Sequence, residues 1–421
     1  MKIAIVADVV YPYSIGGTEK RIYEISTRLV KKGHQVTIYC MKWWKGPATR
    51  VEGGVQLKAI SPYFPLYVSE RRSIKEALFF SLHCFKLIKE DFDILDVDHM
   101  PHVALFSTKL VALLKKKTLY AIWNEVWGIA YWIQYMGPAG IIAAWVEKVA
   151  ARLPDKLVAV SDHTASALMT ELNVPLHKIA VIPNGISLAE LKAVNPATPR
   201  SDVIFVGRLL AHKNVALLVK CIALLKATHP RIRCLIVGRG PEKDNLLKLT
   251  RENGLQENIV FIDAVEDHTQ LYALMKASRV FVLPSTREGF GIVVLEANAC
   301  GLPVITINHP HNAARHLIKE GVNGRTVTLS AENLAQAIDQ YITIEQKILA
   351  HVSWLQHYDW DYLTQKVEDM YVTQQDMKPV ANTRSMPLKA DGDEQAIGAR
   401  EKVFVKSSAL VKKKLKEDEG R

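Results

Sequence analysis

Apolar runs typical of buried strands alternate along this chain with stretches whose apolar positions recur at helical spacing. The first run covers residues 2–9, and the apolar side chains between Ile22 and Val30 fall on one face of a helix predicted over residues 17–34. The pattern predicts further strands at 35–40, 93–98, 117–125 and 155–161. Such units build a parallel sheet with helices on both faces.

A second series of strand-like runs follows a proline-bearing stretch at 193–201, which is typical of a hinge. Its strands are predicted at 202–209, 233–240, 258–265, 279–285 and 302–307. The fold class is therefore α/β, with two Rossmann-like, doubly wound parallel-sheet domains that face a cleft. The predicted organisation is a domain at 1–192, the hinge at 193–201, a domain at 202–354, a helix at about 355–375 that completes the first domain, and a disordered tail at 376–421.

Composition limits the classes of protein that fit this pattern. The 421 residues are 49% hydrophobic, as in a globular protein, and the five cysteines form no C-x-x-C pair. Scattered cysteines indicate a reducing compartment, and the first residues meet Asp8 too early for a signal peptide. We therefore expect a cytoplasmic location.

The net charge of +11 is concentrated near the amino terminus, where residues 1–120 hold 19 Lys and Arg against 11 Asp and Glu. A basic surface favours anionic partners such as a phospholipid surface, although it also describes an ordinary solvated face. We expect no nucleic-acid partner, because no recognition helix, zinc knuckle or aromatic RNA motif accompanies the charge.

Residues 126–146 carry no charged side chain over 21 positions, a length that could span a bilayer. The Gly137-Pro138 break, the central Gln134 and an acidic residue on each flank argue against a span. Two other interpretations stay open. The segment is either part of a core or an interfacial element whose Trp and Tyr side chains rest at the headgroups of a membrane.

Several stretches have the features of anion-binding sites. Gly16 and Gly17 allow a tight turn before the first helix, whose amino end presents unpaired N–H groups. The turn matches neither the dinucleotide fingerprint nor the nucleotide P-loop. Arg208 and Lys213 follow a strand, where two cations can clamp a diphosphate, or can simply be surface charges.

The stretch from Pro284 to Ile305 holds Glu288 and Glu296, separated by seven small or apolar residues. Glu288 is predicted in a glycine-rich turn and Glu296 inside the following helix, where an unpaired carboxylate would be costly. Hydroxyl groups or cations must therefore satisfy both. The N–H groups of Phe290, Gly291 and Ile292 open that helix and can face a phosphate. The alternative is a capping glutamate followed by a surface glutamate.

These motifs together resemble glycosyltransferase family 4, the retaining enzymes of the GT-B fold. The resemblance covers about residues 1–375 and rests on the Pro284–Ile305 stretch, the Gly16-Gly17 turn, and the sequences KLVAVSDHTASAL, VIPNGI, FVGRLLAHKN and VFVLPS. It implies that residues 202–354 hold a nucleotide-diphosphate sugar, with UDP or GDP as the nucleotide, and that residues 1–192 hold the acceptor.

The resemblance also implies roles for single residues. Glu288 would bind hydroxyls of the donor sugar and Glu296 the ribose, while Arg208 and Lys213 would neutralise the diphosphate. The remaining donor-binding residues would be Gly16, Gly17, Val265, Phe290, Gly291 and Ile292. It further implies transfer with retained configuration and no metal or other cofactor.

Two positions depart from the family pattern. Asn124 stands where the family usually has a histidine near the donor sugar, and an amide can donate a hydrogen bond but cannot carry a proton. We count Asn124 with Glu288, Arg208 and Lys213 among the predicted catalytic residues. Asp263 replaces a usual glycine near the expected base pocket.

The acceptor side is less well marked in the sequence. Asp96, Asp98, His99 and His102 follow another strand and could line the cleft, hold a metal or form an ordinary polar turn. We predict acceptor contacts for Asp98, His99 and Trp127, and no metal site.

The sequence therefore predicts a hexosyltransferase that moves a sugar to a saccharide or lipid-linked saccharide, in cell-surface polysaccharide or glycan assembly. We place it in the cytoplasm, peripheral on the cytoplasmic face of a membrane. The alternative is a non-catalytic nucleotide-sugar-binding protein of the same fold.

Overall fold

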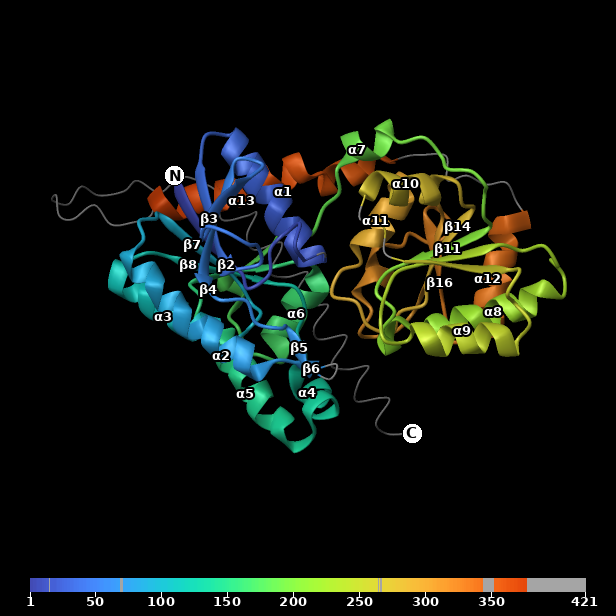
Figure 1. Cartoon of the computed structure of the whole chain (residues 1–421), viewed down its shortest axis with the longest axis horizontal. Helices are drawn as coiled ribbons and strands as arrows, with labels where there is room; N and C mark the ends of the chain where they lie inside the picture. Colours follow the sequence, from blue (N-terminus) through green and yellow to red (C-terminus); the bar gives the residue numbers. More distant parts are fainter. Residues whose placement is uncertain (15, 69–70, 264, 266, 344–351, 377–421) are drawn as a thin grey trace, which may run out of the picture. The chain divides into compact units, whose positions relative to one another are not determined.

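The computed structural model describes residues 1–14, 16–68, 71–263, 265, 267–343 and 352–376. Most of the tail predicted at 376–421 lies outside the described residues. Two separate parallel sheets form the framework, and a two-stranded ribbon of β5 (Tyr67–Val68) and β6 (Arg71–Arg72) accompanies them (Figure 1).

The first sheet has eight strands in the order β10-β9-β8-β7-β1-β2-β4-β3, and only β3 runs antiparallel to its neighbour. Its strands are β1 (Lys2–Val6), β2 (Gln35–Met41), β3 (Thr49–Glu52), β4 (Val55–Ser61), β7 (Ile94–Asp98), β8 (Leu119–Trp123), β9 (Lys156–Ala159) and β10 (Ile179–Val181).

Helices cover both faces of this sheet because alternate strand residues point to opposite sides. Ile3 and Ile5 pack in one core with α1 (Gly17–Lys31) and α13 (Trp360–Asp376). Ala4 and Val6 pack in another with α2, η1, α3 and the ends of α5 and α6. These elements are α2 (Ile74–His83), the 3₁₀ helix η1 (Cys84–Lys89), α3 (Ala104–Lys115), α5 (Gly140–Ala150) and α6 (Asp162–Thr170).

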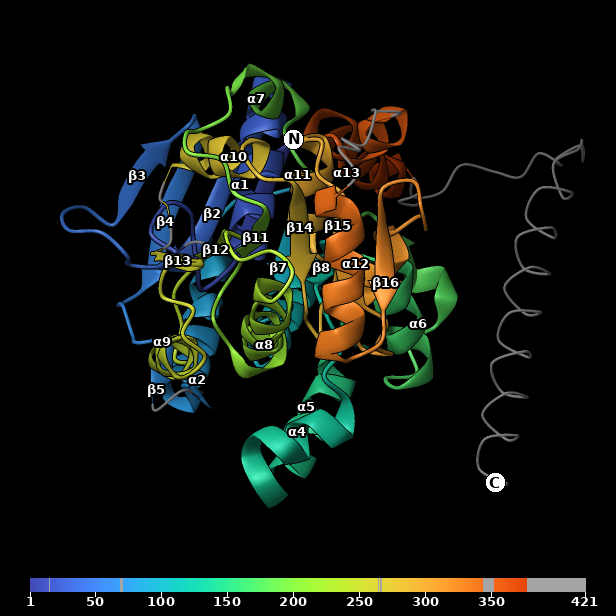
Figure 2. The same cartoon turned by 90° about the vertical axis from the view of Figure 1, so that its right-hand side faces the viewer.

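The second sheet is wholly parallel, with the order β13-β12-β11-β14-β15-β16. Its strands are β11 (Val203–Val206), β12 (Cys234–Val237), β13 (Ile259–Ile262), β14 (Val280–Leu283), β15 (Val304–Ile307) and β16 (Gly324–Val327). Figure 2 shows α12 beside α8 in front of this sheet. The helices of this part are α8 (Val215–Lys226), α9 (Lys243–Glu252), α10 (His268–Lys276), α11 (Ile292–Ala299) and α12 (Ala331–Thr343).

The predicted strands are present, and most of them end earlier than the apolar runs suggest, although β2 extends one residue beyond its predicted end. The run at 2–9, for example, forms strand only over Lys2–Val6, and the run at 202–209 only over Val203–Val206. Beyond those ends the regular strand stops, while apolar residues such as Val9 and Leu209 remain buried. The sequence analysis missed β3, β4, β10 and β16.

The final helix was predicted at about 355–375, but it begins at Trp360 and follows a 3₁₀ turn at Val352–Tyr358. It packs on the first sheet. The Tyr371 hydroxyl donates to the Asp96 carboxylate in β7, and the rings of Tyr371 and Tyr120 lie 5.0 Å apart. Lys32, which follows α1, forms a 2.8 Å ion pair with Glu368.

Residues 126–146 form α4 (Gly128–Met136), a 3₁₀ turn at Gly137–Ala139 and the start of α5, a helical hairpin broken where Gly137-Pro138 predicts it. The core interpretation is wrong for the outer side of this hairpin, because Ile142 and Trp145 are 68% and 62% exposed. Among the described residues, no helix is both long enough and apolar enough to cross a membrane.

A buried cluster of charged side chains connects the segment after β1, the β5–β6 ribbon and α2. Asp8 and Glu76 are fully buried, and Arg72 donates to the Asp8 carboxylate and lies 3.9 Å from Glu76. Burial raises the pKa of Asp8 to about 6, although Arg72 opposes the shift. Burial, with the Asp8 carboxylate next in weight, raises the pKa of Glu76 to about 8. This cluster makes folding depend on pH.

We predict that Glu76→Gln stabilises the protein relative to the wild type as pH rises. The folded state holds the Glu76 proton more tightly than the unfolded state, whose pKa is about 4.3. The wild type therefore loses stability as pH rises through the folded pKa of about 8, and the amide does not. Urea denaturation at several pH values measures this difference, with the exposed Glu257→Gln as control. A wild-type-to-variant difference that does not change with pH would contradict it.

Candidate functional site

The site forms where the loops after two neighbouring strands meet. β11 pairs with β14, so the segments that follow them leave the same edge of the second sheet side by side. The Thr286 N–H donates to the His212 carbonyl at 2.9 Å, which ties the two loops together. The backbone of Glu288 is fixed in turn by bonds to His311 and Ala313. The loop that carries Glu288 is thus held on both sides.

Lys213 and Glu288, both predicted site residues, form a direct ion pair at this place. Their Nζ and Oε1 atoms lie 2.6 Å apart, with side chains 17% and 10% exposed. Burial lowers the pKa of the neighbouring His212 to about 4, and the Lys213 charge adds to the shift. His212 is therefore neutral at physiological pH and adds no positive charge beside the Lys213–Glu288 pair.

Arg208 lies at the same sheet edge but differs from Lys213 in its surroundings. Its side chain is exposed, and it forms no ion pair with any residue that the structure describes. An exposed guanidinium beside a paired lysine can receive an anion without first giving up a protein partner.

The amino end of α11 supplies backbone donors next to Glu288. Gly291 precedes the helix with φ of 93°, and a Cβ there would lie 2.6 Å from the Ala314 Cβ, so the turn requires glycine. Phe290 is buried against Tyr358. No acceptor in the described part of the chain is recorded for the N–H groups of Phe290, Gly291 and Ile292. Their binding of a phosphate stays a prediction.

The Gly16-Gly17 turn contributes differently from the prediction. A Cβ on Gly17 would lie 3.2 Å from the Ile292 side chain, so this turn approaches α11. Beside Gly16, however, the carboxylate of Glu19 already lies at the amino end of α1 and accepts a 2.6 Å bond from Ser14. The first helix therefore carries its own anion there.

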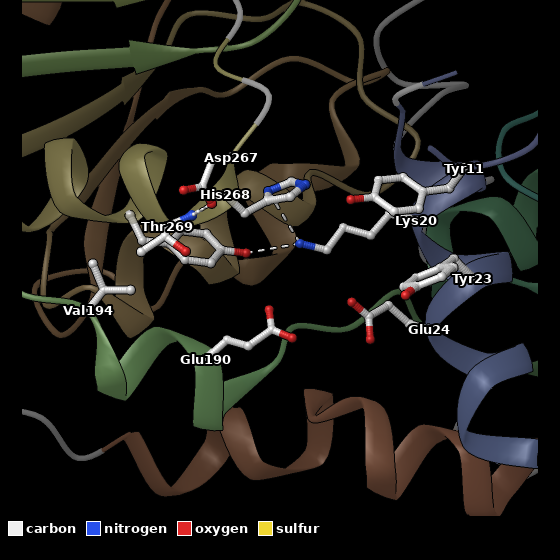
Figure 3. A pocket seen from close by; sticks show the side chains of 10 residues that line it. Tyr11, Lys20, Tyr23, Glu24, Glu190, Val194, Asp267, His268 and Thr269 are labelled. Carbon is white, nitrogen blue, oxygen red and sulfur yellow. Dashed lines mark hydrogen bonds between the residues drawn. The ribbon is translucent and has the colours of Figure 1, made fainter. Parts of the chain in front are cut away.

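Glu296 has the partners that its apolar surroundings demand. It is 7% exposed and accepts from the Tyr272 hydroxyl at 3.1 Å, with Lys20 Nζ at 3.6 Å. A cavity of about 280 Å³ adjoins Lys20 and Tyr272. Figure 3 shows Lys20 reaching toward His268 in this cavity, with Glu24 and Glu190 across from it. The remaining lining residues are Tyr11, Tyr23, Val194, Asp267 and Thr269.

The segment that leads to α10 contains Asp263 and Val265, and it precedes in the chain the lining residue Asp267. Val265 is half-buried and packs against the core. The exposed Asp263 pairs with Lys243, and that hydrogen bond lowers its pKa. Within the described residues, no hydrogen bond or ion pair joins Val265 or Asp263 to Glu296.

Asn124 follows β8 and is held in place by its amide group. The Nδ2 atom donates to Thr18 Oγ1 at 2.9 Å and to Asp98 Oδ1 at 3.2 Å. Both hydrogens of the amide are thereby used, and no donor to its Oδ1 atom is recorded within the described ranges. The side chain can accept a hydrogen bond from a bound hydroxyl.

The polar residues at the end of β7 and just after it are buried rather than open to a cleft. Asp98 and His99 are each 4% exposed, and His99 lies 3.3 Å from the Asp98 carboxylate. The Asp96 carboxylate accepts a hydrogen bond from the Tyr371 hydroxyl. Burial, together with the neighbouring His99, lowers the pKa of His102 to about 3. The described residues contain no group of three or more metal-ligating side chains placed to hold an ion. Asp98 orients Asn124, and its contact with an acceptor stays a prediction.

Trp127 belongs to an aromatic cluster at the start of the α4–α5 hairpin. Its indole N–H donates to Glu125 at 2.7 Å, and its backbone N–H donates to the buried Glu147. Arg287, which immediately precedes Glu288, donates to Glu125 at 3.2 Å and lies 3.8 Å from the Tyr131 ring centroid. Arg287 thus connects the hairpin to the loop that carries Glu288.

The sequence analysis missed the roles of Arg287, Lys20, Tyr272 and Thr18. Arg287 had a signal, since it is adjacent to Glu288 within the recognised motif. Tyr272 and Thr18 carried none, because their partners lie 24 and 106 residues away in the chain. Only the tertiary structure brings such pairs together.

Two Rossmann-like parts, each built on a largely parallel sheet, are the architecture of a GT-B glycosyltransferase. Sucrose-phosphate synthase from Thermosynechococcus elongatus superposes with a TM-score of 0.73 over 90% of this chain and 100% of its own, at 19% identity. The Anabaena protein HepE, solved with UDP-glucose, gives a TM-score of 0.67 over 89% and 100% of the two chains, at 18% identity. These likenesses establish the fold.

The sequence itself matches two models that divide the chain between them. Residues 15–190 match Glycosyltransferase Family 4, and residues 189–352 match Glycosyl transferases group 1. The chain belongs to this family of glycosyltransferases. The gpi3 subunit of phosphatidylinositol N-acetylglucosaminyltransferase from Schizosaccharomyces pombe is 25% identical over 387 residues, which are 87% of this chain and 79% of that protein.

We predict that Gly289→Ala lowers kcat/KM by at least about tenfold, since misplacing a site by about 1 Å can cost 10². A Cβ at Gly289 would lie 2.4 Å from the Asn124 carbonyl oxygen, so the loop of Glu288 must shift. Glu257→Ala is the control, because Glu257 is exposed in the turn before β13 and is not a predicted site residue. Steady-state kinetics with a transferable donor compares the two. An equal or smaller loss in Gly289→Ala would show that this close approach does not position Glu288.

Proposed function

We propose that this chain is a retaining, metal-independent hexosyltransferase that moves a sugar from a UDP- or GDP-sugar to a saccharide or lipid-linked saccharide. The observation that carries the proposal is the Lys213–Glu288 pair, set beside the unoccupied N–H groups that open α11. A cation and a helix amino end can bind the phosphates of an activated sugar, and a carboxylate can accept hydrogen bonds from its hydroxyl groups.

Each group would take one part of the donor. Glu288 accepts hydrogen bonds from sugar hydroxyls, while Lys213 and Arg208 face the diphosphate together with the α11 amides. Glu296 accepts from the ribose hydroxyls, with the Tyr272 hydroxyl and Lys20 holding its carboxylate in position. The 280 Å³ cavity beside these residues offers space next to the ribose position.

The proposed reaction takes place on one face of the sugar. The bond from the anomeric carbon to the phosphate oxygen breaks, a bond from that carbon to the acceptor oxygen forms, and the acceptor proton passes to the departing phosphate oxygen. Lys213, Arg208 and the α11 amides stabilise the negative charge that develops on the diphosphate. These fixed groups supply the stabilisation that a metal supplies elsewhere. No closely spaced carboxylate pair is needed, in contrast to retaining glycosidases.

The acceptor and the location are part of the same proposal. The fission-yeast relative is named for transfer to phosphatidylinositol, and a lipid-linked acceptor suits the exposed apolar side of the α4–α5 hairpin. We place the enzyme on the cytoplasmic face of a membrane, in cell-surface polysaccharide or glycan assembly. UDP is the first donor nucleotide to test, because HepE was solved with UDP-glucose.

We predict that Glu288→Ala lowers kcat by on the order of 10²–10³, as removal of one preorganised transition-state contact does in other enzymes. Radiolabelled sugar transfer measures turnover. Thermal shift with UDP-, GDP- and ADP-sugars separately measures donor binding, because a donor that binds only the folded state raises its stability.

The alternative is a non-catalytic nucleotide-sugar-binding protein, which the loss of the usual histidine at Asn124 motivates. Donor-dependent stabilisation without any turnover in the wild type would favour it. The absence of stabilisation by every nucleotide sugar would overturn both readings.

We predict that Asn124→Ala lowers turnover by about tenfold or more, since a lost hydrogen bond in a site is worth about 1–1.5 kcal/mol. Asn124→Asp is the matched variant, because it retains the acceptor oxygen but loses the donors to Thr18 and Asp98. A wild-type rate in Asn124→Ala would remove this residue from the site.

A further inference from the structure

We infer that the outer side of α2, η1, α3, α4 and α5 is a docking surface for an anionic lipid bilayer. The inference deepens the proposed function, because it supplies the means by which the enzyme reaches a lipid-linked acceptor. It rests on the position, exposure and charge of this layer of helices, including α2 and α3, which the sequence analysis did not single out.

The helices share one side of the first sheet. Residues of α2, η1, α3 and α5 pack in the same core against Ala4, Val6 and their neighbours. The α4 helix packs on α5, and the Tyr135 hydroxyl at its end accepts from the Arg72 N–H just before α2. Figure 1 shows α3, α2, α5 and α4 along the same side of this sheet. Their solvent-facing sides therefore point away from it together.

These solvent-facing sides are apolar to an unusual degree. Leu78 and Leu82 lie one turn apart on α2, and Ile141, Ile142 and Trp145 lie within one turn of α5. Their exposed fractions range from 51% to 68%. The docking surface also includes Ile74, Phe79, Phe85, Ile88, Leu110, Leu113, Leu114, Ile129 and Ile133, each at least 36% exposed. Exposed apolar side chains gathered on neighbouring helices in this number indicate an interaction site.

The charge on these helices selects an anionic partner. Their only carboxylates, Glu76 and Glu147, are both 0% exposed. Glu147 is occupied internally, accepting from the Trp127 and Gly128 N–H groups and from the Trp132 indole. The cations are Lys75, Lys86, Lys89, Lys109, Lys115 and Lys148. Lysines around apolar side chains, without exposed carboxylates, match anionic headgroups over acyl chains.

Acidic residues at the margin of this layer do not reverse its sign. Asp93 pairs with Lys117 at 3.5 Å, and Asp155 pairs with Lys109 at 2.7 Å. The α4 and α5 helices have nine and eleven residues, which suits an element lying in the interface. Trp145 supplies the amphipathic ring that such elements place at headgroup level.

Vesicle flotation of the full chain tests the inference. We expect the wild type to float with vesicles of mixed phosphatidylcholine and phosphatidylglycerol at low salt, and to bind pure phosphatidylcholine more weakly. The triple variant Ile141→Ser, Ile142→Ser and Trp145→Ser should lose at least about tenfold in affinity, because the apolar area inserted into the interface is removed. Lys75→Gln with Lys89→Gln should weaken binding only to the anionic vesicles.

The matched control is Leu224→Ser with Val322→Ser, two exposed apolar residues of the second sheet's part, which should bind vesicles like the wild type. All variants retain residues 377–421, so any contribution from that segment is constant. A wild type that stays unbound, or a triple variant that binds as the wild type does, would overturn the inference. So would a self-associated wild type that the triple variant converts to monomer without vesicle binding in either, since the partner would then be a second copy.

Donor binding keeps this result separate from the proposed function. The docking variants lie outside the donor site, so nucleotide-sugar thermal shifts should be unchanged in them. Donor stabilisation without vesicle binding would remove the docking surface alone. Vesicle binding without stabilisation by any nucleotide sugar would remove the proposed function alone.

Discussion

The ion pair between Lys213 and Glu288 depends on the neighbouring positions of β11 and β14 in the second sheet. Parallel strands release their following loops at one edge, so residues 75 positions apart meet at 2.6 Å. The same edge presents the amino end of α11, whose first amides cannot be paired within the helix. The order of the strands thus brings together the Lys213 and Glu288 side chains and the first N–H groups of α11.

Around Asn124, the first sheet's part contributes amide and hydroxyl groups. Asn124 is fixed by Thr18 and Asp98, and the Gly289 carbonyl accepts from Ser161 at 3.1 Å. Neutral groups of this kind orient hydroxyls without competing for the phosphate. The first sheet's part also supplies charged partners, since Lys20 of α1 lies 3.6 Å from Glu296 and Glu125 accepts from Arg287.

Apolar runs predicted most of the parallel strands, because a strand buried on both faces reads as a continuous apolar run, but β4, β10 and β16, which are partly exposed, were missed. Most predicted strands were too long, since residues such as Val9 and Leu209 remain buried after leaving the ladder. The antiparallel β3 was missed because its exposed Thr49 and Arg50 show no burial period. At the site, Glu288 and Lys213 could be predicted from a motif. The Tyr272 partner of Glu296 could not, because a lone tyrosine in an amphipathic helix looks like any other.

Arg287 has a mechanical consequence for the molecule. Its guanidinium is held by Glu125, the Val126 carbonyl and the Tyr131 ring, while the next residue is Glu288, whose carboxylate pairs with Lys213. Consecutive Cα atoms are only about 3.8 Å apart, so one peptide unit separates the two anchorages. The position of Glu288 is therefore coupled to the position of the hairpin, so that a tilt of the hairpin moves Glu288 and a displacement of Glu288 moves the hairpin.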